Sequence, residues 1–356
     1  MEFALSDEQQ MIAETARAFF AENATSERTR AAMGASGADA GIDRALWQAF
    51  CTELGLSGVG IPEAAGGAGL GMVELALVAE AAGAQVAALP MLGSLALAAQ
   101  AIAAGGTAVQ QAEVLPGLLS GETIAAYVHD AALQAEGDVL TGSDPFVAHG
   151  AAAGVFVVTS NTGAWLVRAG APGLTVTTQT TMDQTRPLAR VTLAGVQGEP
   201  FADAAAAIAR AHACGFITVA AEALGGAQAA LDRTVAYSKE RVQFGRPIGS
   251  FQAYKHRLAD LVIEIEQARS AVWWAACAAD EGSEDAELAL HAAKSFAADT
   301  FFLCAGNMIQ LHGGIGFTWE HDAHLYFKRA RAIQSALGNG SWHREQVAAL
   351  ILGDAA

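Results

Sequence analysis

The residues best placed to do chemistry gather in one stretch, residues 236–259. Arg241 and Phe244 are three positions apart, so on a helix they would project from one face. Pro247 stands between two glycines and cannot continue that helix, and a second apolar-periodic segment begins near Gln252. A guanidinium, an aromatic ring and an amide around one turn suit a long, planar, anionic ligand such as a dinucleotide. An ordinary helical hairpin with a surface arginine fits the same spacing.

Outside that stretch, candidates for acid–base or metal chemistry are few. Glu222 lies among small residues and is interpreted as a buried structural carboxylate paired with a neighbour. Residues 318–324, Thr-Trp-Glu-His-Asp-Ala-His, could bind a metal or move protons, but their acidic residues favour the start of a helix. Lys328, Arg329 and Arg331 could face phosphates, although a solvated cationic face is the simpler interpretation. We therefore expect no metal site.

Composition limits the classes of partner. The chain has 356 residues and a formal net charge of -17, which argues against nucleic acid or an anionic membrane as the main partner. Hydrophobic residues make up 53% and charged residues only 16%, so we expect part of the surface to be buried between subunits. An anionic ligand would need local positive charge, which makes each clustered arginine informative.

The N-terminus and the cysteines indicate a cytoplasmic protein. The start, Met-Glu-Phe-Ala-Leu, lacks the basic segment of a signal peptide, and no apolar run reaches membrane-span length without a charge, glycine or turn residue. The four cysteines are far apart, without metal or disulfide spacing, and are expected to be reduced core thiols: Cys51, Cys214, Cys277 and Cys304.

Periodicity divides the chain into three parts. Residues 6–9 resemble a capping box, and helical spacing continues to about residue 120. Short apolar or alternating runs then indicate strands, and the helical period returns from residue 203. We expect an α+β, mostly α fold with an N-terminal helical domain (1–121), a small β-barrel or sandwich domain (122–202) and a C-terminal four-helix bundle (203–356). The glycine-rich loop of residues 60–71 has no preceding strand and no following lysine, which argues against a phosphate loop.

Three motifs in this order resemble the acyl-CoA dehydrogenase family over essentially the whole chain. Residues 62–69 read Pro-Glu-Ala-Ala-Gly-Gly-Ala-Gly, similar to the family's Pro-Glu-x-x-Gly-Gly-x-Gly. Residues 241–252 are the most specific match, an Arg-x-x-Phe-Gly elbow followed by Ile-Gly-Ser-Phe-Gln. Residues 310–316, Gln-Leu-His-Gly-Gly-Ile-Gly, are close to the family's Gln-x-x-Gly-Gly-x-Gly.

The resemblance implies FAD at a subunit interface, an acyl-CoA substrate, and an electron-transfer flavoprotein or similar acceptor. One subunit of the family lends side chains to its neighbour's flavin. Carried over, Arg241 would pair with the pyrophosphate and Phe244 would pack beside the flavin. Gln252 and Gln310 would hydrogen-bond the cofactor.

The third motif carries backbone rather than side-chain contacts. Gly313 and Gly314 would let the chain approach the adenosine part of the cofactor closely, since a side chain there would block it. His312, just before them, is interpreted as a packed loop histidine rather than an acid or a base.

The chain departs from the family where the proton must be removed. Oxidation of a thioester needs a carboxylate close to its α-carbon. The family's glutamate follows an Arg-Asp-Ala segment, and the matching residues 329–340 place Gly338 at its position. Other members carry the base on an earlier helix, where counting back from the elbow reaches Gly215. Neither residue can accept a proton, so the catalytic base is unassigned.

The middle domain departs as well. The family's Thr-Glu-Pro-x-x-Gly-Ser-Asp has no clear match after Thr123, where residues 124–130 stand, and its Lys-x-Trp-Ile-Thr run is missing in the region of residues 140–146. The contacts lent to a neighbour are therefore present, while much of the chain's own flavin and substrate site is missing.

This asymmetry predicts a subunit of a heteromeric, FAD-dependent acyl-CoA dehydrogenase that introduces an α,β double bond into an acyl-CoA thioester. A second acyl-CoA dehydrogenase-like chain would supply the base, as in bacterial two-chain members acting on steroid-type or other bulky thioesters. Two alternatives stay open: a catalytically silent structural partner of an active paralogous subunit, and an active homo-oligomer with a non-standard base.

Overall fold

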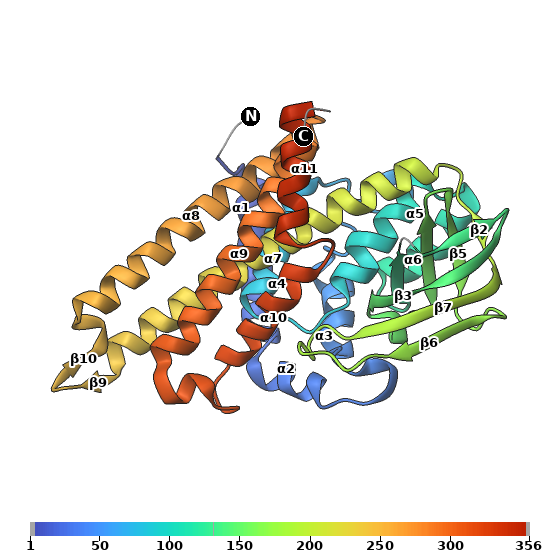
Figure 1. The fold of residues 1–356 in the computed structure, drawn as a ribbon. Helices are drawn as coiled ribbons and strands as arrows, with labels where there is room; N and C mark the ends of the chain where they lie inside the picture. The colour runs from blue at the N-terminus through green and yellow to red at the C-terminus, as the bar shows by residue number, and fades with distance from the viewer. Residues whose placement is uncertain (1–3, 131, 354–356) are drawn as a thin grey trace. The chain divides into compact units, whose positions relative to one another are not determined.

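The computed structural model describes residues 4–130 and 132–353 of a chain that divides into two compact units (Figure 1). The first, called the helical unit, combines Met1–Ser26, Ala76–Ala87 and Phe216–Ala356. The second, called the mixed unit, combines Glu27–Leu75 and Ala88–Gly215. Two long helices, α4 (Met72–Ala84) and α7 (Ala204–Glu240), have residues in both units, and so does α2 (Ser26–Met33), whose first residue, Ser26, belongs to the helical unit.

The mixed unit opens with short helices that bury aromatic residues. Trp47 and Phe50, at helical spacing in the sequence, are each 1% exposed. They lie on α3 (Arg44–Ala49) and on the π-helical turn that extends it, Phe50–Leu54. The other helices of this part are α2 (Ser26–Met33), the π-helix Met91–Ala99 with its continuation α5 (Gln100–Gly105), and α6 (Ala108–Leu119).

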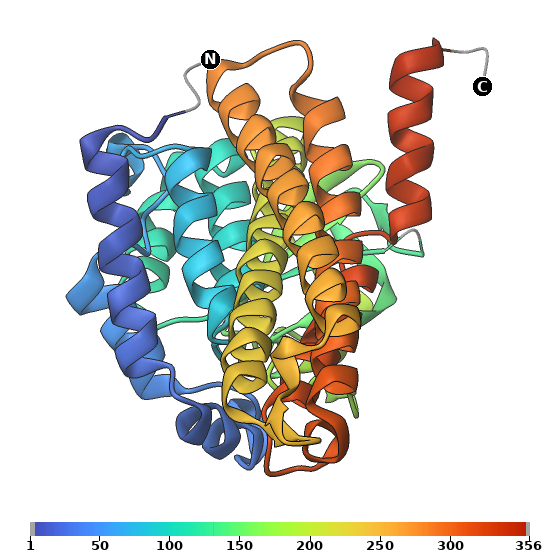
Figure 2. The same cartoon turned by 90° about the vertical axis from the view of Figure 1, so that its left-hand side faces the viewer.

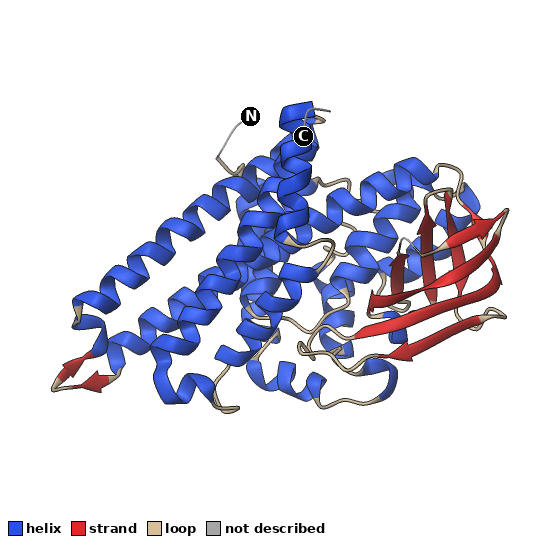
Figure 3. Ribbon diagram, viewed as in Figure 1, coloured by secondary structure: helices blue, strands red, loops and turns tan. Residues whose placement is uncertain are grey.

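Two four-stranded sheets form the β part of the mixed unit (Figure 3). Their orders are β1-β4-β5-β8, with β1 parallel to β4, and β2-β3-β7-β6, which is antiparallel throughout. Val128 and Phe156 of the first sheet belong to one buried cluster with Leu140 and Val191 of the second, as in a sandwich. The strands are β1 (Ala125–His129), β2 (Gln134–Glu136), β3 (Val139–Ala148), β4 (Val155–Ser160), β5 (Gly163–Arg168), β6 (Leu174–Thr178), β7 (Leu188–Gln197) and β8 (Glu199–Pro200).

Long helices make up the helical unit, and Figures 1 and 2 both show α8 (Gln252–Glu281) and α9 (Ala286–His312) side by side. The shorter helices are α1 (Asp7–Asn23), α10 (Ala323–Ser335) and α11 (Gly340–Leu352). The expected capping box is confirmed: the Gln9 amide N–H donates to Ser6 Oγ, and the Ser6 N–H donates to Gln9 Oε1. Apolar residues at helical spacing in α8, among them Leu261 and Ile265, are buried.

The expected order of helices, a small β module and helices again is confirmed, and all four cysteines are buried and free. Among the described helices, α7 is long and apolar enough to cross a membrane, with a mean hydropathy of 1.4 over its most apolar window. The expectation from the sequence stands, because this helix contains Gly215, Glu222 and Gly225. Of that window 56% is buried within the protein, which is typical of a core helix.

Candidate cofactor and catalytic site

The elbow after α7 is a hairpin rather than a continuation of the helix. Strands β9 (Val242–Gln243) and β10 (Arg246–Pro247) pair antiparallel, and Phe244 and Gly245 form the turn between them with φ of 54° and 77°. Positive φ at both central residues matches the twist of a tight hairpin. The expectation that Arg241 and Phe244 share one helix face is therefore wrong, because α7 ends at Glu240.

The side chains of the elbow are turned toward solvent. Phe244 is 92% exposed, and its ring meets the edge of Phe251 at 6.2 Å between centroids. Arg241 and Gln252 are exposed, and within residues 4–130 and 132–353 neither side chain has a hydrogen-bond partner. These groups are free to bind a molecule from outside the chain.

The third motif, residues 310–316, lies at the same end of the helical unit as the elbow. The ring of His312, the last residue of α9, stacks on Tyr237 of α7 at 4.4 Å between centroids. The Tyr254 hydroxyl, from the first turn of α8, donates to the Leu311 carbonyl oxygen at 2.6 Å. These two contacts bring the elbow and the glycine loop together, although the motifs are far apart in the sequence.

The glycine loop is open on its outer side. Gly313 has a φ of 63°, and a Cβ at either Gly313 or Gly314 would meet no atom within 4 Å. The Gln310 side chain is exposed and makes no hydrogen bond with any described residue. The positive φ accounts for a glycine at Gly313, whereas nothing among the described residues demands one at Gly314. A planar group approaching the backbone from outside would favour a small residue there as well.

His312 is a packed residue, as the sequence predicted. Its Nδ1–H donates to the Met308 carbonyl oxygen at 2.7 Å, and its side chain is buried. Burial lowers the pKa of His312, and the nearby His321 lowers it further. Burial also raises the pKa of Tyr254 to about 12. Both groups are therefore neutral near pH 7 and position the loop rather than exchange protons.

The position of the missing glutamate is closed by other side chains. Gly338 lies between α10 and α11 with a φ of 98°, and a Cβ there would collide with the Trp342 ring. The Lys294 ammonium, with the side chain fully buried, donates to the carbonyl oxygens of Gly338 and Gln334. Burial lowers the pKa of Lys294 to about 8. The structure thus puts a buried cation where the family resemblance implies an anion.

A pair of histidines completes this closed region. His343 Nε2–H donates to the Leu337 carbonyl oxygen at 3.1 Å, and His343 Nδ1 lies 2.7 Å from His291 Nδ1. In the neutral pair His291 must therefore be the donor to His343. Burial first, then the charges of Lys294 and His291, lower the pKa of His343 to about 3. Burial lowers the pKa of His291 as well.

Aromatic packing fills the space around the pair. The Phe216 ring lies 5.1 Å from His291 and 4.9 Å from His343, and the Trp342 ring lies 5.4 Å from His291. Phe216 follows Gly215, the second position considered for a base, which is buried inside α7. We call Phe216, His291, Lys294, Trp342 and His343 the closed cluster. Sequence analysis missed all five, because ordinary helical residues separate them along the chain.

In the mixed unit, the segments that lack the family's flavin motifs make internal contacts. His129, at the end of β1, has its Nδ1 2.8 Å from Thr159 Oγ1, and its ring lies 5.0 Å from that of His212. The Tyr127 ring lies 6.2 Å from His212. Asp144 of β3 accepts from the backbone N–H groups of His129 and Phe146. Burial lowers the pKa of His129 and raises that of Asp144.

The other residues considered for acid–base or phosphate chemistry make structural contacts. Glu222 forms a buried ion pair with Arg329, so the paired-carboxylate interpretation holds, while a solvated cationic face is wrong for Arg329. Lys328 lies 4.1 Å from the Trp319 ring centroid. Asp322 accepts from Ser26 Oγ at 2.5 Å just before α10, consistent with a helix start. Within the described residues, no group of three or more His, Cys, Asp or Glu side chains could hold a metal ion.

Comparison with known proteins identifies the family. Residues 6–122 match the model of the acyl-CoA dehydrogenase N-terminal domain, and residues 206–352 match that of the acyl-CoA dehydrogenase C-terminal domain. Acyl-CoA dehydrogenase IpdE2 of Mycolicibacterium smegmatis is 35% identical over 347 residues, covering 94% of this chain and 96% of the relative.

Two solved structures are similar over nearly their whole length. A variant of the Tcur3481-Tcur3483 steroid ACAD has a TM-score of 0.88 at 35% identity and covers 97% of this chain and 98% of its own. The ChsE4-ChsE5 complex from Mycobacterium tuberculosis has a TM-score of 0.92 at 27% identity and covers 100% of both chains. The motifs, the order of elements and these matches agree, and the chain belongs to the acyl-CoA dehydrogenase family.

Proposed function

We propose that this chain is one subunit of a heteromeric, FAD-dependent acyl-CoA dehydrogenase and completes the flavin site of a second, catalytic chain. The observation that carries the proposal is the contrast within the helical unit. The residues that the family resemblance assigns to a neighbour's flavin, Arg241, Phe244 and Gln310 among them, are exposed, while the position that it assigns to the base is closed by packed side chains.

The available residues fit FAD. The Arg241 guanidinium would neutralise the pyrophosphate, because a planar cation binds phosphate oxygens in pairs. Gln252 and Gln310 would donate and accept hydrogen bonds at the edge of the cofactor, and Phe244 would exclude water from its face. Gly313 and Gly314 leave room for adenosine against the backbone. FAD supplies the acceptor for the hydride that leaves the β-carbon of the thioester.

The chain's own residues do not fit the proton-transfer step. A base must reach the α-carbon of the thioester in its charged form. Gly338 offers no side chain. Lys294 and His343 donate to the backbone carbonyls of Gly338 and Leu337, and His291 is hydrogen-bonded to His343. The carboxylate would therefore come from the second chain, and the electrons would pass on to an electron-transfer flavoprotein or a similar acceptor.

The relatives support a two-chain assembly and a bulky substrate. The ChsE4-ChsE5 structure is a complex of two proteins, and the Tcur3481-Tcur3483 structure is of a steroid acyl-CoA dehydrogenase. By analogy we propose a steroid-type or similarly large acyl group as the substrate and the cytoplasm as the location. We also carry forward the three domains 1–121, 122–202 and 203–356 as a proposal.

The test compares the chain purified alone with the chain co-expressed with a paralogue that carries the motif glutamate. The co-purified assembly should contain flavin, and its absorbance should bleach on mixing with a bulky acyl-CoA thioester. Arg241→Ala in this chain should leave the subunits together and lower the flavin content at least tenfold. Stoichiometric flavin and thioester oxidation by the chain alone would refute the proposal.

A purely structural role is the second candidate, favoured by the closed cluster. It would appear as an assembly whose flavin content and bleaching do not respond to Arg241→Ala, although the second chain is unstable without its partner. The same two measurements therefore separate the candidates.

A further inference from the structure

The basic residues of this acidic chain are concentrated at the elbow. Residues 239–257 hold five of the 20 arginine and lysine residues but only one of the 37 acidic residues. All five residues are exposed, and we call them the basic patch: Lys239, Arg241, Arg246, Lys255 and Arg257. The patch creates a positive potential that the rest of a chain with a net charge of -17 does not share.

The hairpin brings the two ends of the basic patch together. The Ile248 N–H donates to the Arg241 carbonyl oxygen at 2.8 Å, which closes the elbow on itself. Figure 1 accordingly shows the start of α8 next to the end of α7, with β9 and β10 projecting between them. Lys239 lies in the last turn of α7, and Lys255 lies in the first turn of α8. Cations from both helices therefore meet at one end of the helical unit.

Contacts within the chain do not account for these cations. Lys239, Lys255 and Arg257 have no ion-pair or hydrogen-bond partner within residues 4–130 and 132–353. Arg246 packs over the Phe251 ring, 4.0 Å from its centroid, and this contact leaves its charge without an anion. The patch is therefore available to an anion from outside the described chain.

The start of α8 is an unfavourable place for a cation. The N-terminal end of a helix carries partial positive charge, so acidic residues are stabilising there and basic ones are not. The first turn of α8 has no acidic residue and contains Lys255, whereas Asp280 and Glu281 lie at the other end. The charges along α8 thus oppose its dipole at both ends. Charges kept against local stability are typical of residues that serve a ligand.

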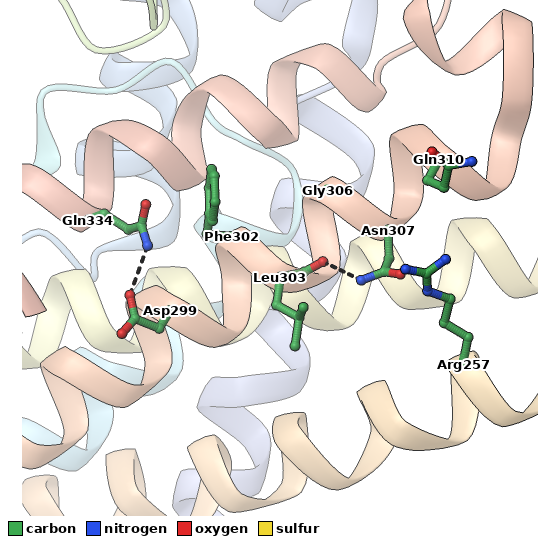
Figure 4. A pocket seen from close by; sticks show the side chains of 8 residues that line it. All are labelled: Arg257, Asp299, Phe302, Leu303, Gly306, Asn307, Gln310 and Gln334. Atoms are coloured by element: carbon green, nitrogen blue, oxygen red, sulfur yellow. Dashed lines mark hydrogen bonds between the residues drawn. The ribbon is translucent and has the colours of Figure 1, made fainter.

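Arg257 connects the basic patch with the residues proposed to bind flavin. It lines an open pocket of about 490 Å³ that Gln310 also lines. Figure 4 shows the Arg257 side chain reaching from α8 toward Asn307, at the same end of the pocket as Gln310. Arg241, the proposed partner of the pyrophosphate, belongs to the patch itself. The positive potential is therefore continuous with the proposed flavin contacts.

We propose that the basic patch captures FAD from solution by attracting its dianionic pyrophosphate, with Lys255 acting at long range rather than by contact. The inference rests on the proposed function, and it extends that function from the residues that hold FAD to how FAD reaches them. An acidic chain repels an anionic cofactor, and a local potential of the opposite sign raises association rates by roughly 10- to 1,000-fold.

The test is Lys255→Glu in the co-expressed assembly from which the flavin has been removed. The change in flavin fluorescence on rapid mixing gives the association rate constant of FAD at low and at high salt. This rate constant should fall about fivefold at about 20 mM salt and less than about twofold at about 1 M, because salt screens exposed charges. The dissociation rate constant should stay the same, because the proposal gives Lys255 no contact with the cofactor.

Arg190→Glu is the matched control. It makes the same change of charge at an exposed arginine of β7, outside the basic patch, and should alter the association rate constant by less than about twofold. The urea midpoint of Lys255→Glu should be kept or raised, because glutamate is favoured in the first turn of a helix. Slower capture with undiminished stability separates a role in binding from a role in folding.

The outcomes separate capture from the proposed function. Equal FAD association in wild type, Lys255→Glu and Arg190→Glu at low salt would overturn capture and leave the proposed function standing. Unchanged FAD association with slower binding of acyl-CoA, or with slower assembly of the two chains, would overturn it too and assign the patch to that partner. Arg241→Ala should instead raise the dissociation rate constant of FAD. A wild-type assembly without flavin would overturn both proposals.

Discussion

Two carbonyl groups between α10 and α11 are each bound by a buried side chain of the closed cluster. Leu337 and Gly338 both have positive φ, of 54° and 98°, so neither continues a helix and their carbonyl oxygens need other partners. His343 donates to Leu337 and Lys294 donates to Gly338. Gly338, which the family resemblance puts in the position of the catalytic glutamate, is therefore part of a turn stabilised by buried side chains.

Gly338→Glu should not restore a working base. A side chain there meets the Trp342 ring and must adopt a left-handed backbone, which costs about 1–3 kcal/mol in strain alone. We expect a lower urea midpoint and, with FAD added, no oxidation of acyl-CoA by the chain alone. Gly282→Glu is the control, because Gly282 also has a positive φ, of 62°, but a Cβ there meets nothing. Thioester oxidation gained by Gly338→Glu alone would show that the site is latent.

The histidine pair should make the fold sensitive to acid. In the unfolded chain His343 takes up a proton near its ordinary pKa of 6.5, whereas in the folded chain it stays neutral until about pH 3. Between these values the unfolded state binds more protons, so the free energy of unfolding falls as pH falls, by up to about 1.4 kcal/mol per pH unit for each proton.

Urea unfolding over this pH range measures the slope. His343→Phe should reduce the pH dependence by about one proton, whatever it does to stability at neutral pH. His256→Phe, which replaces an exposed histidine of α8, is the matched control for removing an imidazole. An identical slope in wild type and His343→Phe would contradict the neutral, buried pair.

The ion pair between Glu222 and Arg329 joins helices α7 and α10. The two side chains are 6% and 3% exposed, so removing one charge leaves the other buried without a partner. Arg329→Met should lower the free energy of unfolding by about 3–5 kcal/mol. The double variant Glu222→Leu with Arg329→Met should recover most of that loss. Additive effects in this double-mutant cycle would show that the pair is not coupled.

Element order was predictable because it depends on local patterns. Helical spacing in α8, the capping box at Ser6 and the short apolar strands each appear within a few neighbouring residues. The hairpin at Phe244 was not predictable, because a non-glycine residue with positive φ leaves no clear signal in a helix-like Arg-x-x-Phe spacing. That space would be left next to Gly313 and Gly314 could be expected only from the family resemblance.

The closed cluster shows a different limit of prediction from the sequence. Phe216, His291 and His343 lie on three separate helices, and each reads as an ordinary helical residue in its own segment. Their contacts depend on how the helices pack, which periodicity does not report. The absence of a glutamate was visible in the sequence, but what fills its place was not.

At the scale of the whole molecule, the described surface has large apolar side chains that the chain does not cover itself. Near the glycine loop, Phe317 is 86% and Trp319 is 63% exposed, and on α11 Ile351 is 65% exposed. Exposed aromatic residues close to unpaired polar groups are typical of protein interfaces. This distribution agrees with the low share of charged residues in the sequence.

The chain alone should bind an apolar dye, and the second chain should displace it. We expect anilinonaphthalene sulfonate fluorescence to fall several-fold on assembly, and to fall comparably in the free chain on replacing both Phe317 and Trp319 by Ser. Met11→Ser, at a 63% exposed position on α1, should have little effect. Dye binding that is unaffected by the second chain would place the interface elsewhere.

The exposed aromatic residues Phe317 and Trp319 have a consequence for the cell that makes this protein. If the chain assembles with a second chain as proposed, a copy synthesised in excess would keep this apolar surface exposed, and quality-control proteases and chaperones recognise such surfaces. Matched synthesis of the two polypeptides, rather than a surplus of either, would then set how much working enzyme accumulates.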